Sequence, residues 1–275
     1  MARLTLCDLT FCGQSAAGLG TAIAIKELKL CFDIGHLSDP ILAASNVFVS
    51  HGHTDHIGEL PNYLAIRALQ HRNLATIFLP ASISDDVRDT LHRWQKFSST
   101  RFDFRIVDLY PDGTIPLTNG LSVTPFALDH VVDTFGFLVS RSVTKLSATY
   151  SNLPGDEIKA LKQKGTTDLF YTSTRPLAAY LPDTLPAGLD NAPEAVWEAP
   201  VLLVEASFLD DSKPLEKVRK GKHLVLADLV QRLPRFRGQH VLLFHFSKLY
   251  NECDIGPLVA KQIPDPWKER IHCFL

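Results

Sequence analysis

The segment SHGHTDHIGELP, from Ser50 to Pro61, places His51, His53, Asp55 and His56 close together in the chain. Imidazole and carboxylate groups suit zinc best, with manganese or iron as other possibilities. Residues two apart in an extended segment point to the same side, so His51 and His53 can bind one ion. Asp55 and His56 follow where the chain turns into a helix and can serve a second ion. Two ions about 3.5–4 Å apart would activate a water and stabilise a leaving oxygen.

A metal centre needs ligands from other parts of the chain as well. His130 follows the strand-like segment LSVTPFALD, and His245 ends the strand-like segment HVLLF. Side chains at strand ends can converge on one rim of a sheet, so both are expected to be ligands. Taken alone, either histidine is as well explained by a structural role, and a chance cluster on a solvated turn is the alternative for Ser50–Pro61. The remaining histidines with no such placement are taken as structural: His36, His71, His92, His240 and His272.

The composition is that of an ordinary globular protein. The chain has 275 residues, 45% of them hydrophobic and 21% charged, and a net charge of −2. This length and even composition predict one domain covering residues 1–275. The overall charge does not indicate nucleic-acid binding, although a local basic patch remains compatible with it. Five cysteines without a CxxC motif, no visible secretory signal and no long apolar run predict a cytoplasmic protein without disulfides or a membrane span.

Strands and helices alternate along the chain, and they must position these residues. The pattern predicts strands over 4–11, 21–25, 28–32, 46–50, 76–79, 105–109, 121–126, 136–139, 169–172, 201–205 and 240–244. It predicts helices over 60–68, 84–96, 156–164 and 224–232. Residues 13–20 (GQSAAGLG) are expected to form a loop, and the proline-rich residues 181–200 a surface excursion. Hairpin-rich strands with interspersed helices favour an α/β (α+β) arrangement of two sheets with helices outside them.

Several motifs carry a resemblance to a known family. FDIG, the histidine-rich segment, LPGDEIKALKQKG, VEASFLDD and HFSKLY together resemble ribonuclease Z, the tRNA 3′-processing endonuclease of the metallo-β-lactamase superfamily. The resemblance runs from about Gly13 to Tyr250 and is nearest to the short, plant-like form. It implies a four-layer αββα sandwich with the metals at one edge of the paired sheets. It also implies a precursor tRNA as substrate and a homodimer.

The resemblance assigns a role to each matching residue. One zinc would be held by His51, His53 and His130, and the other by Asp55, His56 and His245. Asp55 would also be the general base. Glu205 would orient His223, the proton donor to the leaving group. A carboxylate beside an imidazole does raise its basicity and fix its tautomer, yet without the resemblance Glu205 and His223 would be taken for an ordinary surface pair.

Two features depart from the family pattern. The family has an aspartate that bridges both metals in a Gly-Asp-Thr motif after a strand. LFYTSTRP is the expected match, with Ser173 at the aspartate position, and Asp168 lies too far back to substitute. A neutral hydroxyl is a poor ligand that brings no charge. This favours weakened or single-metal occupancy, although two metals with a bridging water, a non-catalytic paralogue and an engineered change remain alternatives.

The second departure concerns the long, lysine-rich arm with which ribonuclease Z enzymes often clamp tRNA. The region between His130 and Leu169 looks short, so no such arm is expected. It offers only Lys159, Lys162 and Lys164. Two basic stretches could contact phosphates instead, or could be solvated surface: KVRKGKH (Lys217, Arg219, Lys220, Lys222) and RLPRFRGQH (Arg232, Arg235, Arg237).

Three functions are therefore carried forward. The first is a metal-dependent phosphodiesterase of the ribonuclease Z type that cuts precursor tRNA just 3′ of the discriminator nucleotide. The second is a weakened or silent metal- or RNA-binding paralogue, for which Ser173 is the reason. The third is a hydrolase of the same superfamily acting on a smaller ester or phosphodiester.

Overall fold

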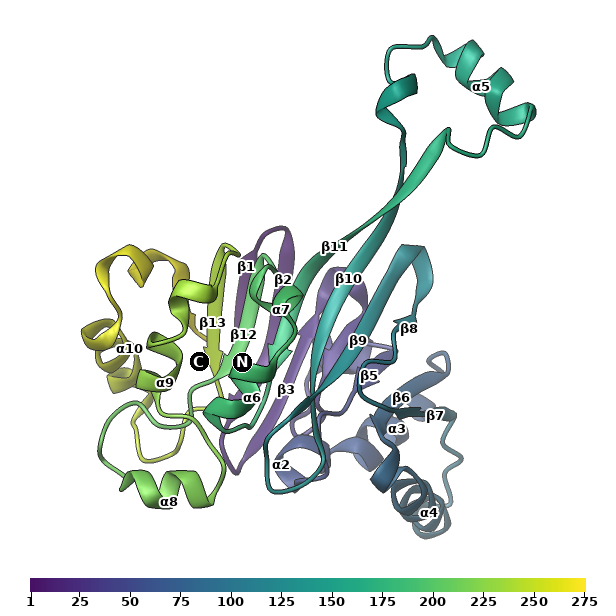
Figure 1. The fold of residues 1–275 in the computed structure, drawn as a ribbon. Coiled ribbons are helices and arrows are strands. Elements are labelled where there is room, and N and C mark those ends of the chain that lie inside the picture. Colours follow the sequence, from purple (N-terminus) through teal and green to yellow (C-terminus); the bar gives the residue numbers. More distant parts are fainter.

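The structure is a computed structural model that describes residues 1–275. Two seven-stranded sheets face each other, and helices cover the outer face of each sheet (Figure 1). This arrangement confirms the predicted four-layer αββα sandwich. No helix combines the length and the apolar character needed to cross a bilayer.

The first sheet contains the N-terminal strands in sequence order. They are β1 (Ala2–Leu6), β2 (Leu9–Ala16), β3 (Gly20–Ile25), β4 (Leu30–Phe32), β5 (Asn46–Phe48), β6 (Ala75–Pro80) and β7 (Phe104–Leu109). The pairs from β1 to β4 are antiparallel, whereas those from β4 to β7 are parallel. The outer face of this sheet packs on α1 (Asp39–Ala43), α3 (Leu60–Leu69) and α4 (Ala81–Ser98).

The second sheet repeats this plan. Its strands are β8 (Ile115–Pro116), β9 (Leu121–Leu128), β10 (Thr134–Leu146), β11 (Phe170–Leu181), β12 (Val201–Glu205), β13 (His240–Phe244) and β14 (Ile271–Cys273). The pairs from β8 to β11 are antiparallel, and those from β11 to β14 are parallel. Its outer face packs on α6 (Pro186–Asn191), α7 (Glu194–Trp197), α9 (Leu226–Val230) and α10 (Glu252–Gln262).

Aromatic rings from both sheets form the centre of the sandwich. Phe32 of β4 stacks on Tyr180 of β11 with a centroid separation of 4.6 Å, and Tyr180 stacks on Phe244 of β13 at 5.0 Å. All three side chains are fully buried. Stacked rings contribute more than their buried area alone, so this column fixes the two sheets against each other directly beneath the strand ends.

Two local predictions for the N-terminal region are wrong. The segment 4–11 is a hairpin and not one strand, because the chain reverses at Cys7 and Asp8, whose φ angles are +48° and +62°. Consecutive left-handed residues are what a two-residue hairpin turn requires. The expected loop over 13–20 is mostly strand, since β2 continues to Ala16 and β3 begins at Gly20.

Strands β10 and β11 continue far beyond the body of the molecule (Figure 1). Their pairing extends to Leu146 and Phe170, whereas β9 accompanies β10 only as far as Arg141. The two-stranded ribbon ends in α5 (Gly155–Gln163), near the predicted helix over 156–164. The expectation that no arm is present is therefore wrong. The ribbon has two exposed faces, so its strands lack the apolar alternation by which a sheet strand is found.

The proline-rich segment 181–200 is not a surface excursion. It forms α6 and α7, and Leu189, Val196 and Trp197 are fully buried against the second sheet. Pro186 begins α6, because its fixed φ suits a first helical turn, and Pro193 directly precedes α7.

Candidate metal centre

The ends of strands from both sheets meet at one rim of the sandwich. His51 and His53 follow β5 and precede α2 (Thr54–Ile57), which contains Asp55 and His56. His130 lies in the loop between β9 and β10, and His245 directly follows β13. The carboxyl ends of parallel strands share one edge, which brings these segments together.

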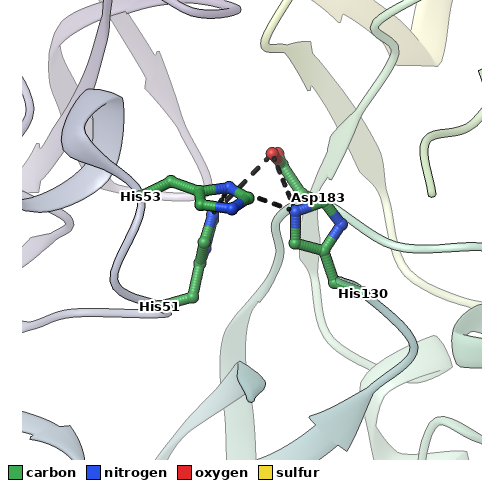
Figure 2. Close-up of side chains that lie close together, drawn as sticks. All are labelled: His51, His53, His130 and Asp183. Carbon is green, nitrogen blue, oxygen red and sulfur yellow. Dashed lines mark hydrogen bonds and ion pairs between the residues drawn. The ribbon is translucent and has the colours of Figure 1, made fainter. Parts of the chain in front are cut away.

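A fourth group joins the first histidines in Figure 2, the carboxylate of Asp183, which follows β11. His53 Nδ1 lies 3.1 Å from His51 Nε2 and 3.3 Å from His130 Nε2. Asp183 Oδ2 lies 3.9 Å from His51 Nε2 and 3.8 Å from His130 Nε2. A tetrahedral ion with bonds of about 2.0–2.1 Å has ligand atoms ~3.3 Å apart. The spacing of these four donors therefore fits one such ion.

The second group is built from Asp55, His56 and His245. His56 Nε2 lies 3.2 Å from His245 Nε2, and Asp55 Oδ2 lies 3.8 Å and 3.5 Å from these two nitrogens. Asp183 Oδ2 is only 3.6 Å from His56 Nε2, so this oxygen borders both groups.

Asp183 has the properties of a metal-bridging carboxylate. It is 2% exposed, and its Oδ1 atom accepts no hydrogen bond although His245 Nδ1 lies 3.1 Å away. That nitrogen is engaged by Ser207 Oγ at 3.0 Å. A buried carboxylate oxygen without a partner is costly unless a cation neutralises it. The donor set of imidazoles and carboxylates thus fits a pair of divalent ions.

The ring nitrogens that face away from the centre are also held. His51 Nδ1 contacts Ser50 Oγ at 2.9 Å, and His130 Nδ1 contacts the carbonyl of Lys222 at 3.0 Å. Such outer contacts fix the tautomer and the orientation of a ligating histidine.

Asp33 anchors the second group from below. His56 Nδ1 lies 2.8 Å from Asp33 Oδ2, and this oxygen also accepts hydrogen bonds from Tyr180 at 2.6 Å and from Ser50 Oγ at 3.0 Å. Asp33 Oδ1 accepts the backbone N–H of Ser50 at 2.7 Å. One fully buried carboxylate therefore ties the aromatic column between the sheets to the histidine-rich segment.

The carboxylates control the charge of this centre. Burial strongly lowers the pKa of His51, as do the neighbouring imidazoles, so its ring is neutral and able to ligate. Burial disfavours the charged form of His56 as well, yet Asp183 and Asp33 raise its pKa well above the usual value. The buried carboxylates thus attract positive charge, which protons or divalent ions can supply.

Glu205 and His223 lie beside the ligand groups, as predicted for an orienting pair. His223 Nδ1 is 3.5 Å from Glu205 Oε1, which also accepts the backbone N–H groups of Thr184 at 2.8 Å and Leu224 at 3.3 Å. Burial lowers the pKa of His223, but the Glu205 carboxylate outweighs it and the pKa rises to about 9. Glu205 is fully buried while the His223 side chain is 22% exposed, so the imidazole can face a substrate.

Known proteins share this architecture and sequence. Residues 36–246 match the family model described as the beta-lactamase superfamily domain. The tRNase Z TRZ1 of Arabidopsis thaliana is 33% identical over 265 residues, which cover 95% of this chain and 93% of that protein. This chain belongs to the ribonuclease Z family of the metallo-β-lactamase superfamily. It therefore has the fold of a superfamily of divalent-metal hydrolases.

One further relative supports this ribonuclease Z assignment, and one solved structure supports the fold. The chloroplastic tRNase Z TRZ2 of Arabidopsis thaliana is 32% identical over 250 residues, which cover 90% of this chain and 70% of that protein. The crystal structure of human tRNase Z, short form (ELAC1), has a TM-score of 0.63 at 19% identity and covers 97% of both chains. The human structure supports the fold.

The family position assigned to Ser173 must be corrected. Ser173 pairs with Val143 in the arm, and ten residues of nearly extended chain place it about 30 Å from Asp183. Asp183, in the segment LPDTLP, is the carboxylate that borders both ligand groups. The signal was an Asp-Thr pair directly after a strand, with proline in place of glycine. The sequence pattern ends this strand at residue 172 and predicts a surface excursion over 181–200, so Asp183 is not recognised as the residue after the strand.

Asp33, Ser50 and Ser207 were also missed as site residues. None of them has a diagnostic spacing, and their role depends on contacts that only the folded chain makes. Asp33 in the FDIG motif gave the clearest signal, because an acidic residue at the end of a buried strand needs a partner.

The two basic stretches differ in availability. Arg232, Arg235 and Arg237 pair with carboxylates of α6, α7 and the residue after α7, with the tightest contact 2.6 Å from Arg232 to Asp190. These surface ion pairs favour the interpretation of this stretch as solvated surface over phosphate contact. In the other stretch, α8 (Leu215–Lys220) carries Lys217 and Lys220 without an ion pair, whereas Lys222 Nζ lies 2.7 Å from Asp129 Oδ1.

Proposed function

We propose that this protein is a zinc-dependent endonuclease that cuts precursor tRNA just 3′ of the discriminator nucleotide. The observation that carries the proposal is the double ligand cluster joined by Asp183. The oriented Glu205–His223 pair beside it and the relatives named tRNase Z support the same reaction. Imidazole-rich donors favour zinc, with manganese or iron as weaker candidates.

The ions, when bound, would activate a water and neutralise charge on the scissile phosphate. His51, His53 and His130 would hold one ion, and Asp55, His56 and His245 the other, with Asp183 between them. Asp55 is oriented by the backbone N–H of Gly18, which donates to its Oδ2 at 2.7 Å. Nearby imidazoles outweigh burial and lower the pKa of Asp55, so its carboxylate is ionised and placed to take a proton from the attacking water.

His223 would donate the proton that the departing ribose oxygen needs. With a pKa of about 9, this imidazole carries its proton at neutral pH. Glu205 keeps the ring oriented because two backbone N–H groups and Ser207 hold its carboxylate in place. A positioned acid of this kind contributes about 10²–10⁴-fold to a rate.

Precursor tRNA would bind through cations on the arm and on α8. The arm carries Arg141, Lys145, Lys159, Lys162, Lys164 and Arg175. The family resemblance gives such an arm the task of clamping the tRNA elbow. Free lysines on α8, beside His223, would meet phosphates near the cleavage site.

A homodimer is part of this proposal. A groove of about 270 Å³ lies between α3 and α4, and its wall includes Leu60 and Trp94. Phe97 on α4 is 75% exposed and Leu69 on α3 is 73% exposed. Such an apolar surface favours burial against a second copy. Trp94→Glu is expected to give monomers in analytical ultracentrifugation.

Cytoplasmic residence also remains a proposal. All five cysteines are free, which suits a reducing compartment. One relative is chloroplastic, so fractionation of cells with an antibody against the chain is the direct test.

The decisive experiment is cleavage of an end-labelled precursor tRNA by zinc-loaded protein, with His53→Ala as the inactive control. A single cut after the discriminator nucleotide is the expected product. Turnover of a small phosphodiester without any cleavage of tRNA would favour the smaller-substrate hydrolase. Absence of both activities in protein shown to bind metal would favour a silent paralogue, although the missing carboxylate is no longer a reason to expect one.

A further inference from the structure

A groove of about 620 Å³ adjoins the metal centre, and His223 is not part of its lining. It lies between the start of α4 and the loops after β7 and β9, and His130 belongs both to its wall and to the ligand cluster. Its volume is within the range of about 300–1,000 Å³ that holds small ligands and single groups of larger ones. The loop that carries His130 thus borders both the ligand cluster and this groove.

The walls of this groove are mainly apolar. Tyr110 is 63% exposed, Val131 58% and Val132 40%, and the lining includes no lysine or arginine. Asp133 is the charged residue that is exposed there. Such a surface repels phosphates but can accept the flat face of a nucleobase, because bases stack on aromatic rings whatever their sequence.

The opposite flank of the metal centre has the reverse character. α8 and α4 lie on opposite sides of the molecule, and the groove begins next to α4 (Figure 1). On the α8 side, Lys217 and Lys220 have no ion pair, and the side chain of His223 is 22% exposed. A strand of RNA crossing the centre therefore meets cations on one flank and a mainly apolar surface without lysine or arginine on the other.

We propose that the groove binds the first nucleotide of the single-stranded 3′ trailer, with its base stacked on Tyr110 and packed against Val131 and Val132. This inference rests on the proposed function. The proton donor His223 must lie beside the leaving 3′-oxygen, which belongs to the tRNA body. The acceptor stem, rich in phosphates, then occupies the basic flank, and the unpaired trailer runs toward the apolar flank. Tyr110 is thereby a specificity-determining residue.

The test compares cleavage of precursor tRNAs that differ only in the first trailer nucleotide, which is a purine, a pyrimidine or an abasic ribose. Wild-type protein should prefer the purine to the abasic substrate by about tenfold in kcat/KM, as expected for one base stacked on an aromatic ring. Tyr110→Ala should remove this preference by slowing the purine and pyrimidine substrates and leaving the abasic substrate unchanged. Tyr110→Phe, which keeps the ring, should retain it. Tyr171→Ala, which removes an exposed tyrosine of the arm, is the matched control and should leave the preference unchanged.

Each other outcome counts against the groove. Equal loss on all three substrates would make Tyr110 a structural residue, and no loss would leave the trailer elsewhere. Turnover of bis-p-nitrophenyl phosphate by wild-type protein reports the metal centre without recognition of a tRNA body. If wild-type protein cleaves this diester and no precursor tRNA, the proposed function fails and the trailer site falls with it. If precursor is cut without regard to the first trailer nucleotide, only the trailer site fails.

Discussion

Replacing Asp183 by asparagine tests whether Asp183, and not Ser173 as the sequence suggests, is the bridging ligand. The substitution keeps the size of the side chain and removes its charge. Asp183 Oδ2 lies 3.6–3.9 Å from nitrogens of three ligand histidines, and Oδ1 is buried without a hydrogen bond. Both oxygens are therefore expected to contribute to metal binding.

The size of the effect follows from this geometry. Two unit charges about 4 Å apart attract each other by about 4 kcal/mol at an effective dielectric constant of 20. Loss of a group that only orients a ligand costs roughly 10–100-fold in metal affinity. Asp183→Asn removes a direct ligand, so zinc affinity should fall by more than about 100-fold, which is about 2.7 kcal/mol.

Zinc competition against a chromophoric chelator measures this loss, and circular dichroism verifies that the variant is folded. Ser173→Ala and Ser173→Asp are the matched controls. Both should bind zinc like the wild type, because Ser173 lies in the arm. Wild-type affinity in Asp183→Asn, or a gain of zinc in Ser173→Asp, would refute the assignment of Asp183 as the bridging ligand.

Three further outcomes are expected. His223→Ala should slow cleavage of precursor tRNA by about 10²–10⁴-fold but leave bis-p-nitrophenyl phosphate turnover nearly unchanged, since p-nitrophenolate leaves without a proton donor. Comparable losses on both substrates would contradict the acid role. Removal of zinc by a chelator should lower the melting temperature by about 7 °C, which scanning calorimetry detects, if free zinc is about 1,000 times its Kd. An unchanged melting temperature would exclude tight binding to the folded state. Replacing 142–174 by a short turn should weaken precursor tRNA binding in gel-shift titrations and leave zinc affinity intact; a loss of zinc affinity would show that the arm supports the centre.

The sequence was informative where chemistry is concentrated in a short segment. Spacing alone predicts that His51, His53, Asp55 and His56 lie together, and the positions of His130 and His245 after strands predict that they join this cluster, which is where the structure places them. β12 and β13 were predicted with their observed ends because they are short, apolar and covered on both faces. The family resemblance supplied Glu205 and His223, whose pairing depends on a contact between different segments.

The failures have physical reasons as well. The β1–β2 turn uses Cys7 and Asp8 and has none of the usual Asn-Gly or Asp-Gly signals. The arm strands are polar because water covers both faces of the ribbon, so their length is not visible in a hydrophobic pattern. Once β11 was ended too early, the family's aspartate position was sought ten residues before its place, and Asp183 was assigned to a loop.

The two halves of strand β11 are held by different neighbours, one half in the arm and the other in the body of the sandwich. Its first half, from Phe170, pairs only with β10 in the arm, whereas its second half is held between β10 and the parallel strand β12. Ala178 to Leu181 pair with Val201 to Val204, and this parallel register fixes where the strand ends. Asp183 follows two residues later, so the body of the sandwich determines its position. A change in the length of the arm is therefore expected to leave Asp183 in place.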